Sequence, residues 1–395
     1  MTIIEFMLKG MLIVLILPAG YLLTSTIASY RFRKQEPARN RFLNIGVLIP
    51  AHNEEEGIVR TIESIRSGDY PANRFEVWVI ADNCNDRTAE RARQAGAQVY
   101  ERVDRDLRGK GFALDWFLKN HRNECLSTDA IAIIDADVVA DRSFLCEMSA
   151  SLSNPDIRVV QAYNGVSNPH AGWRPALIDA AFNIFNHLRM AGSFMLSGTS
   201  VLKGNGMGFR THVLERYGWP CHSIVEDMEF TLELLREGIP VHYNPDAVVR
   251  SEMVTSGKNA SSQRARWEGG RFMLVRQMTR PLLTLFRKSG ETRYLYALAE
   301  LAIPPLSMLA MLFGLATCAA PFLGLPWVAL AAGFWGVLVF YLVSGQIQRK
   351  APVSTWLYLA AAPLYILWKI PLYAGMVIGR NNKTWIRTTR EASNM

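Results

Sequence analysis

The chain has few cysteines and few histidines, and neither residue type is spaced as in a known motif. The five cysteines form no CxxC pair and show no pairing pattern, so reduced thiols on the cytosolic side of a membrane are the simplest interpretation. Three of the seven histidines, His52, His222 and His242, are not arranged as HxH or HxxxH, and we interpret them as ordinary polar residues.

The chain also lacks the common phosphate-binding signatures. Its one glycine-rich stretch, Lys203–Gly208, reads KGNGMG, which is neither GxGxxG nor GxxxxGK[ST], and this excludes a Rossmann or P-loop interpretation. Tight turns beside a substrate, at positions where only glycine fits, are favoured instead. We find no internal repeat and no low-complexity tract.

Acidic residues are outnumbered, since 43 Lys and Arg stand against 35 Asp and Glu and leave a net charge of +8. Many of the basic residues flank apolar runs. This distribution favours an anionic membrane face and an anionic donor over a nucleic-acid partner.

Half of the chain is hydrophobic, and long apolar stretches lie at both ends. Residues 3–30 are followed at once by basic residues, which predicts a membrane span with a cytosolic C-terminal flank; a cleaved signal peptide is the alternative. Three further stretches cover residues 298–320, 326–343 and 356–378, before a basic tail. Three full spans would place that tail outside, against the charge rule, so we expect the last, proline-bearing stretch to be re-entrant or interfacial.

Between these ends, apolar strand-like runs alternate with helical patterns, which predicts an α/β fold with a parallel sheet and helices on both faces. Strands are expected near residues 45–50, 75–80, 97–100 and 130–134, followed by less regular strands near 159–163 and 241–249. Ligands bind at the carboxyl ends of the strands in such sheets, where Asp82, Asp135 and Asp137 fall. Residues 271–288 predict an interfacial helix that Pro281 interrupts or restarts.

Asp135 and Asp137 follow the strand that contains Ile131–Ile134. Alternate residues of a strand point the same way, so the two carboxylates are expected to face one side and to suit a divalent cation. The pattern alone is also compatible with a solvated loop or a helix cap.

Four features therefore occur in chain order: Asp82, the Asp135–Asp137 pair, Glu226–Asp227 at a helix start, and Gln263-Arg-Ala-Arg266-Trp267. This set resembles family-2 inverting glycosyltransferases of the processive type, the group of cellulose, hyaluronan and poly-N-acetylglucosamine synthases. The resemblance covers about residues 45–270 and the membrane segments. It implies a GT-A domain, an α/β fold, joined to transmembrane helices.

The resemblance implies a role for each position. Asp82 would contact the nucleotide base, and Asp135 and Asp137 would hold the ribose and a Mg²⁺ or Mn²⁺ on the diphosphate. Asp227 would be the general base, supported by Glu226, with Val225 where the family usually has Thr.

The resemblance also assigns residues around the diphosphate. Gln263, Arg266 and Trp267 match the QxxRW motif, which lies over the diphosphate and acceptor sugar; Arg forms a bidentate fork to phosphate, and Trp offers a flat face to a sugar ring. A membrane-proximal basic anchor is the local alternative for this stretch. Lys110 matches a lysine that the family places near the donor, although a lysine on the protein surface would occur in the same local sequence.

The chain departs from cellulose synthases at residues 197–210, where their Phe-Phe-Cys-Gly-Ser element is absent. We therefore expect an inverting transferase that uses a UDP-sugar to make β-linked exopolysaccharide. The alternative is transfer of one sugar to a polyprenyl-diphosphate-linked oligosaccharide or another membrane lipid. A non-catalytic nucleotide-binding membrane protein would predict charges inside the apolar segments or lost carboxylates, and the sequence shows little of either.

The expected partners are a nucleoside-diphosphate sugar, a glycan or lipid-linked acceptor and the lipid bilayer, without nucleic acid; a homo-oligomer or export partners are left open. The expected location is the bacterial inner membrane, multi-pass, with a cytoplasmic catalytic domain. The expected division is an N-terminal transmembrane helix (1–30), a GT-A domain (31–268), an amphipathic interfacial region (269–292), C-terminal transmembrane helices (293–380) and a basic cytoplasmic tail (381–395).

Overall fold

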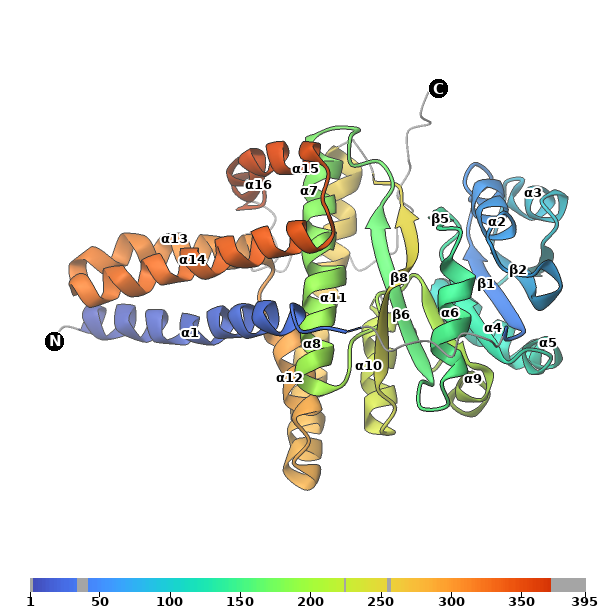
Figure 1. The fold of residues 1–395 in the computed structure, drawn as a ribbon, viewed down its shortest axis with the longest axis horizontal. Helices are drawn as coiled ribbons and strands as arrows, with labels where there is room; N and C mark the ends of the chain where they lie inside the picture. The colour runs from blue at the N-terminus through green and yellow to red at the C-terminus, as the bar shows by residue number, and fades with distance from the viewer. Residues whose placement is uncertain (1–2, 34–41, 224, 254–256, 371–395) are drawn as a thin grey trace. The chain divides into compact units, whose positions relative to one another are not determined.

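The computed structural model describes residues 3–33, 42–223, 225–253 and 257–370, without the side chains of 257–272 and 368. The chain forms two compact units. The sheet unit comprises Arg33–Asn168 and Gly198–Met253, and the helical unit comprises Met1–Phe32, Pro169–Ser197 and Val254–Met395. We describe each unit by itself (Figure 1).

The sheet unit is built on one eight-stranded sheet with the order β3-β2-β1-β4-β7-β6-β8-β5. The strands are β1 (Ile45–Ala51), β2 (Phe75–Asp82), β3 (Gln98–Arg102), β4 (Ala130–Ile133), β5 (Val138–Ala140), β6 (Val159–Val166), β7 (Met207–Arg210) and β8 (Val241–Ser251). The helices are α2 (Ile58–Arg66), α3 (Thr88–Gln94), α4 (Lys110–Asn120), α5 (Arg122–Leu126), α6 (Phe144–Ser153), α9 (Thr211–Tyr217) and α10 (Glu226–Arg236).

The predicted α/β alternation is confirmed, and so is the parallel pairing of the first four strands, but the sheet as a whole is mixed. Strands β1 to β4 pair in parallel, whereas β7 is antiparallel to both β4 and β6, and β5 is antiparallel to β8. Two strands joined in parallel require a connecting segment that crosses over and packs on a face of the sheet. Between β6 and β7, the stretch Pro169–Ser197 belongs instead to the helical unit, so this connection is no such crossover.

Two apolar layers cover the sheet, one on each face. Alternate residues of β1 point into different layers: Val47 and Ile49 pack with α2, α3 and α6, while Leu48 packs with α4, α9 and α10. The strands are therefore buried on both faces, which explains why they read as continuous apolar runs. The layers position α4 and α10 on the same face of the sheet.

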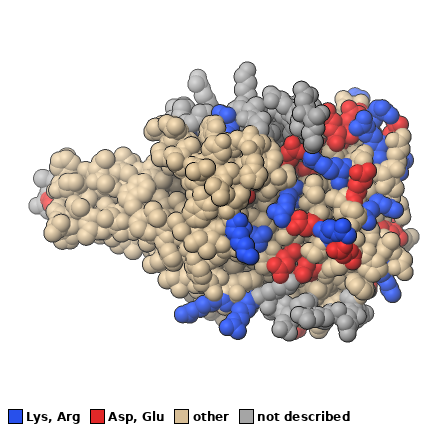
Figure 2. Space-filling view, turned by 45° about the horizontal axis from the view of Figure 1, so that its top comes forward, with Lys and Arg blue, Asp and Glu red and all other residues tan. Residues whose placement is uncertain are grey.

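The helical unit contains α1 (Ile3–Ser29), α7 (Trp173–Phe182), a π-helical turn (Asn183–Leu188), α8 (Arg189–Ser197), α11 (Gly257–Ser289), α12 (Thr292–Ala302), α13 (Leu306–Ala319), α14 (Leu325–Gln348), α15 (Val353–Tyr358) and α16 (Ala362–Trp368). Three helical segments of the described chain are long and apolar enough to cross a membrane: Ile3–Ser29, Leu306–Leu323 and Leu325–Gln348. On the face shown in Figure 2, the surface of α1, α13 and α14 carries almost no charged side chains.

Prolines divide the C-terminal apolar stretches differently from the prediction. The stretch at 298–320 is not continuous, because α12 ends before Pro304 and Pro305 and α13 begins after them. Pro281, in contrast, lies inside the continuous helix α11 and does not interrupt it. In the described part of the last stretch, the apolar segment Val353–Leu367 is too short to count as a span; residues from 371 lie outside the described chain.

One charged pair is buried inside the helical unit. Glu300 of α12 is 3% exposed; it accepts a 2.5 Å hydrogen bond from Tyr21 of α1 and lies 3.4 Å from Arg189 of α8. A buried carboxylate is stable only when it is paired in this way. Glu300 therefore joins three helices that are distant in the sequence.

Candidate active site

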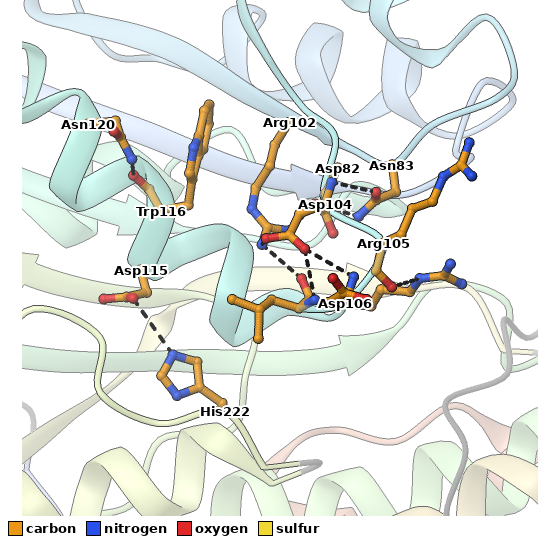
Figure 3. A network of polar contacts seen from close by, with 12 residues as sticks. Asp82, Asn83, Arg102, Asp104, Arg105, Asp106, Asp115, Trp116, Asn120 and His222 are labelled. Carbon is orange, nitrogen blue, oxygen red and sulfur yellow. Dashed lines mark hydrogen bonds and ion pairs between the residues drawn. The ribbon is translucent and has the colours of Figure 1, made fainter.

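Asp82, the last residue of β2, belongs to a buried ionic network (Figure 3). Its Oδ1 accepts hydrogen bonds from Arg102 Nη1 at 2.6 Å and from Asn83 Nδ2 at 3.0 Å. Arg102 ends the neighbouring strand β3 and also binds Asp104 Oδ2 and the carbonyl of Leu107. Because both side chains of the Asp82–Arg102 pair are almost fully buried, the pair fixes the carboxylate at the carboxyl edge of the sheet.

Asp135 lies two residues beyond β4 and is paired with the first residue of α4. Lys110 Nζ lies 2.5 Å from Asp135 Oδ1 and also donates to the carbonyl of Gly204. The Asp135 amide donates to Asn205 Oδ1 at 3.2 Å. Burial alone would lower the pKa of the Lys110 amine, but Asp135 and Glu226 outweigh it and raise that pKa. Lys110 is therefore a charged donor between these carboxylates.

Asp137 does not lie on a strand, so the argument from strand alternation was wrong. Residues 134–137 form a turn between β4 and β5. Thr61 of α2 holds this turn, since its Oγ1 donates to the carbonyls of Ala136 at 2.9 Å and Val138 at 2.8 Å. A Cβ added at Gly57, before α2, would lie 3.6 Å from the Cβ of Asp137. Asp137 is therefore placed beside the start of α2, whereas Asp135 is bound to α4.

Glu226 and Asp227 form the first turn of α10, where the helix dipole favours carboxylates. Burial and the nearby Asp227 raise the pKa of Glu226 to about 8, and burial also raises the pKa of Asp227. Lys110 and Lys203 oppose the rise for Asp227. The pair therefore titrates as a unit and holds a proton near neutral pH.

The close approach of α4 to the segment before α10 brings these groups together. A Cβ at Gly111 would lie only 2.3 Å from the carbonyl oxygen of Cys221, so glycine is required there. Next to this contact the rings of Phe112 and His222 stack with centroids 4.2 Å apart, and His222 faces Asp115 at 3.8 Å (Figure 3). His222 therefore has a packing role.

The remaining predicted donor-binding residues, Gln263, Arg266 and Trp267, fall within α11, and their side chains lie outside the described part of the structure. Their roles stay predictions. Sequence reasoning also missed groups that hold the site together: Arg102, Thr61, Gln161 and Asn205. Asn205 lies in the glycine-rich stretch 203–208, whereas the other three belong to no motif, and only contacts in the structure identify the role of all four.

The residues present fit a divalent cation that is bound by only one or two protein side chains. Within the described chain, no group of three or more His, Cys, Asp or Glu side chains is arranged to hold a metal. Mg²⁺ is commonly bound by one or two carboxylates together with substrate phosphates and waters. Asp135 and Asp137 are the carboxylates that the sequence predicts for such a site.

Comparison with known proteins identifies the family and the fold. The family model described as glycosyltransferase like family 2 matches residues 43–270. A β-monoglucosyldiacylglycerol synthase from Trichormus variabilis is 28% identical over 236 residues, covering 57% of this chain and 48% of that protein. Glucomannan 4-beta-mannosyltransferase 1 from Cyamopsis tetragonoloba is 25% identical over 248 residues, covering 60% and 47%. The chain thus spans about half the length of these curated relatives.

Among solved structures, the mannosyltransferase PcManGT from Pyrobaculum calidifontis, in complex with GDP-Man and Mn²⁺, is similar with a TM-score of 0.55. The match covers 86% of this chain and 98% of that chain at 20% sequence identity, a likeness of fold. The family match spans more than half of the chain and contains every described carboxylate and lysine of the site. The chain therefore belongs to glycosyltransferase family 2, with a GT-A fold.

Proposed function

We propose that the protein transfers one sugar from a nucleoside diphosphate, with inversion, to a hydroxyl group of a membrane lipid, making a β-linked glycolipid. The observation that carries the proposal is the assembly of Lys110 and Asp135 beside Glu226 and Asp227. This cluster combines a cation for a diphosphate with a carboxylate pair for proton transfer. The glucosyldiacylglycerol synthases among the relatives support the lipid acceptor.

The donor would bind along the carboxyl edge of the sheet. Lys110 would contact the diphosphate, and Asp135 and Asp137 would hold a Mg²⁺ or Mn²⁺, which supplies charge stabilisation for the departing diphosphate. The neighbour in complex with GDP-Man and Mn²⁺ has the same fold. Gln263, Arg266 and Trp267 would complete the donor and acceptor site.

Asp82 favours uracil over guanine as the base. Its Oδ1 already accepts from Arg102 and Asn83, which leaves Oδ2 for a ligand. Uracil presents a single imide N–H, whereas guanine presents adjacent N–H and NH₂ donors that match a carboxylate with both oxygens available. UDP is therefore the proposed nucleotide.

Asp227 would act as the general base. The acceptor oxygen attacks the anomeric carbon, the bond from this carbon to the diphosphate oxygen breaks with its electron pair on that oxygen, and the hydroxyl proton passes to the Asp227 carboxylate. Glu226, whose pKa is raised to about 8, would carry the proton of the pair and so add no second negative charge beside the base. One displacement of this kind inverts the anomeric configuration.

A second candidate is extension of a β-linked exopolysaccharide. The sequence Gln263–Trp267 matches the motif of processive synthases, and a glucomannan mannosyltransferase is among the relatives. The relatives that make glucosyldiacylglycerol favour the lipid product over this one. A polyprenyl-diphosphate-linked oligosaccharide is a third acceptor of the lipid class.

We propose that α1, Leu306–Leu323 and α14 span the bacterial inner membrane and that residues 31–268 are cytoplasmic, with 269–292 at the interface. The spans follow from the length and apolar surface of these segments, since about 20 apolar residues cross a bilayer core. An even number of C-terminal spans would return residues 381–395 to the cytoplasm. The positive-inside rule favours that location for a basic tail.

The test is product analysis with the full chain in nanodiscs, given Mg²⁺ or Mn²⁺, native lipid extract and radiolabelled UDP-sugars or GDP-mannose. We expect one labelled species that partitions with lipid and forms only from a UDP-sugar. Label that stays at the chromatogram origin as polymer would establish the second candidate. Absence of transfer with every donor, or equal transfer by Asp227→Asn, would overturn the proposal.

A further inference from the structure

A four-residue turn, Lys203–Gly206, which we call the glycine turn, lies between the donor groups and the base. The carbonyl of Gly204 accepts from Lys110 Nζ, and Asn205 Oδ1 accepts from the amide of Asp135 at 3.2 Å. On its other side, a Cβ added at Gly204 would lie 3.3 Å from Asp227 Oδ2. The turn thus contacts three site groups that come from α4, the turn after β4 and α10.

Gln161 in β6 is 0% exposed, and its side chain holds the glycine turn through hydrogen bonds. Its Nε2 donates to the carbonyls of Asn205 at 2.7 Å and Gly206 at 3.3 Å, and its Oε1 accepts from the Lys203 amide at 2.9 Å. One amide side chain therefore satisfies three backbone groups of the turn, which a residue without both a donor and an acceptor could not do.

Asn205 connects the turn to the strands as well as to Asp135. Its side chain is 1% exposed, and its Nδ2 lies 3.3 Å from Ser251 Oγ in β8 and 3.5 Å from Asn164 Oδ1 in β6. Gly206 has a φ of 70°, and a Cβ there would lie 2.9 Å from the Cβ of Ala162. The turn therefore contacts both β6 and β8, and these contacts determine its position.

We propose that Gln161 and Asn205 are positioning residues, which act through the glycine turn to hold Lys110 and Asp135 at a fixed place relative to Asp227. The inference rests on the proposed function, because it assumes that these groups face donor and acceptor in one reaction. Transfer demands such precision, since a displacement near 1 Å can lower the rate by about a hundredfold. Among the described residues, the Asp82–Arg102 pair shares no hydrogen bond with the turn, so binding of the nucleoside part of the donor is expected to be independent of the turn.

The test compares Asn205→Ala and Gln161→Met with the matched control Asn244→Ala. Asn244 of β8 is 2% exposed; its Nδ2 donates to Ser151 Oγ at 2.8 Å and to Glu147 Oε2 at 3.1 Å, and its Oδ1 accepts from the amide of Asp246. The control thus removes a buried asparagine with a similar set of hydrogen bonds on α6, away from the glycine turn.

Two measurements are made on the full chain in detergent, below its melting temperature. The first is the rate at which limiting acetic anhydride acetylates Lys110, read by peptide mass spectrometry, which requires neither substrate nor activity. We expect it to rise roughly tenfold in both variants, because Lys110 loses the shield of the turn. The second is kinetics and binding, where we expect kcat to fall about tenfold or more while the Kd for uridine, which lacks the diphosphate, changes by less than about threefold.

The outcomes separate this inference from the proposed function. If the unmodified chain transfers no sugar, the proposed function fails, and the acetylation rates still decide the position of Lys110. Unchanged acetylation in Asn205→Ala and Gln161→Met, or an equal rise in Asn244→Ala, would overturn the inference. So would failure of both variants to fold when Asn244→Ala folds, because the network would then serve stability alone.

Discussion

Replacement of Gly204 by alanine separates backbone strain from disturbance of the base. Gly204 has a φ of 75°, a left-handed conformation that alanine adopts with a penalty of about 1–2 kcal/mol. The added Cβ would lie 3.3 Å from Oδ2 and 3.7 Å from Cγ of Asp227. The methyl group would therefore press against the carboxylate and remove space for water or an acceptor hydroxyl.

Gly238, which follows α10, is the matched control. Its φ is 70°, and a Cβ there would meet nothing within 4 Å. Gly238→Ala should therefore lower the free energy of unfolding by about 1–2 kcal/mol through strain alone. Gly204→Ala should lower it by a similar amount and also reduce kcat by about tenfold, because a shift of a few tenths of an ångström displaces the base.

The assay is thermal unfolding of each detergent-solubilised variant together with initial rates of transfer at saturating donor. We expect similar melting temperatures for the two variants and a large difference in kcat. Full activity in Gly204→Ala would refute the placement of Asp227 beside the turn. An equal loss of activity in Gly238→Ala would show that strain, rather than contact with the base, explains the effect.

Three further predictions concern the carboxylates. Asp227→Asn should abolish transfer and leave the Kd for UDP within about threefold, which kinetics and calorimetry would measure; normal turnover would exclude Asp227 as the base. The folded-state pKa of Glu226 is raised from 4.5 to about 8, so its contribution to stability is complete below about pH 4.5 and is lost as the pH rises through 8. The melting temperature should therefore fall between these pH values, and Glu226→Gln should make the melting temperature less dependent on pH. An unchanged pH dependence in Glu226→Gln would contradict the raised pKa. Arg102→Met leaves the Asp82 carboxylate buried without its ion-pair partner, so the free energy of unfolding should drop by about 3–5 kcal/mol and UDP binding should weaken. A variant that is as stable as the original chain and binds UDP as tightly would refute this account.

Sequence reasoning predicted those elements whose signals are local. The apolar runs that became β1, β2, β4 and α1 were recognised because their burial makes them continuously hydrophobic. The antiparallel placement of β7 was missed, since a four-residue strand carries no pattern that specifies its partners. Similarly, Asp135 and Asp137 were correctly placed at the carboxyl edge of the sheet, but their turn conformation was not foreseen.

The sequence by itself determined the α/β alternation, the apolar helices and which carboxylates stand at strand or helix ends, because each follows from residue type and spacing within a short window. Only the tertiary structure decided which groups meet. Lys110 and Asp135 are 25 residues apart, and Asp82 and Arg102 are 20 residues apart. Gln161 belongs to no motif, and the glycine-rich stretch around Asn205 predicted only tight turns; the importance of both residues arises from hydrogen bonds between β6, the glycine turn and Asp135. Such contacts depend on how strands and helices pack, which pairs distant residues whose spacing along the chain carries no periodic signal.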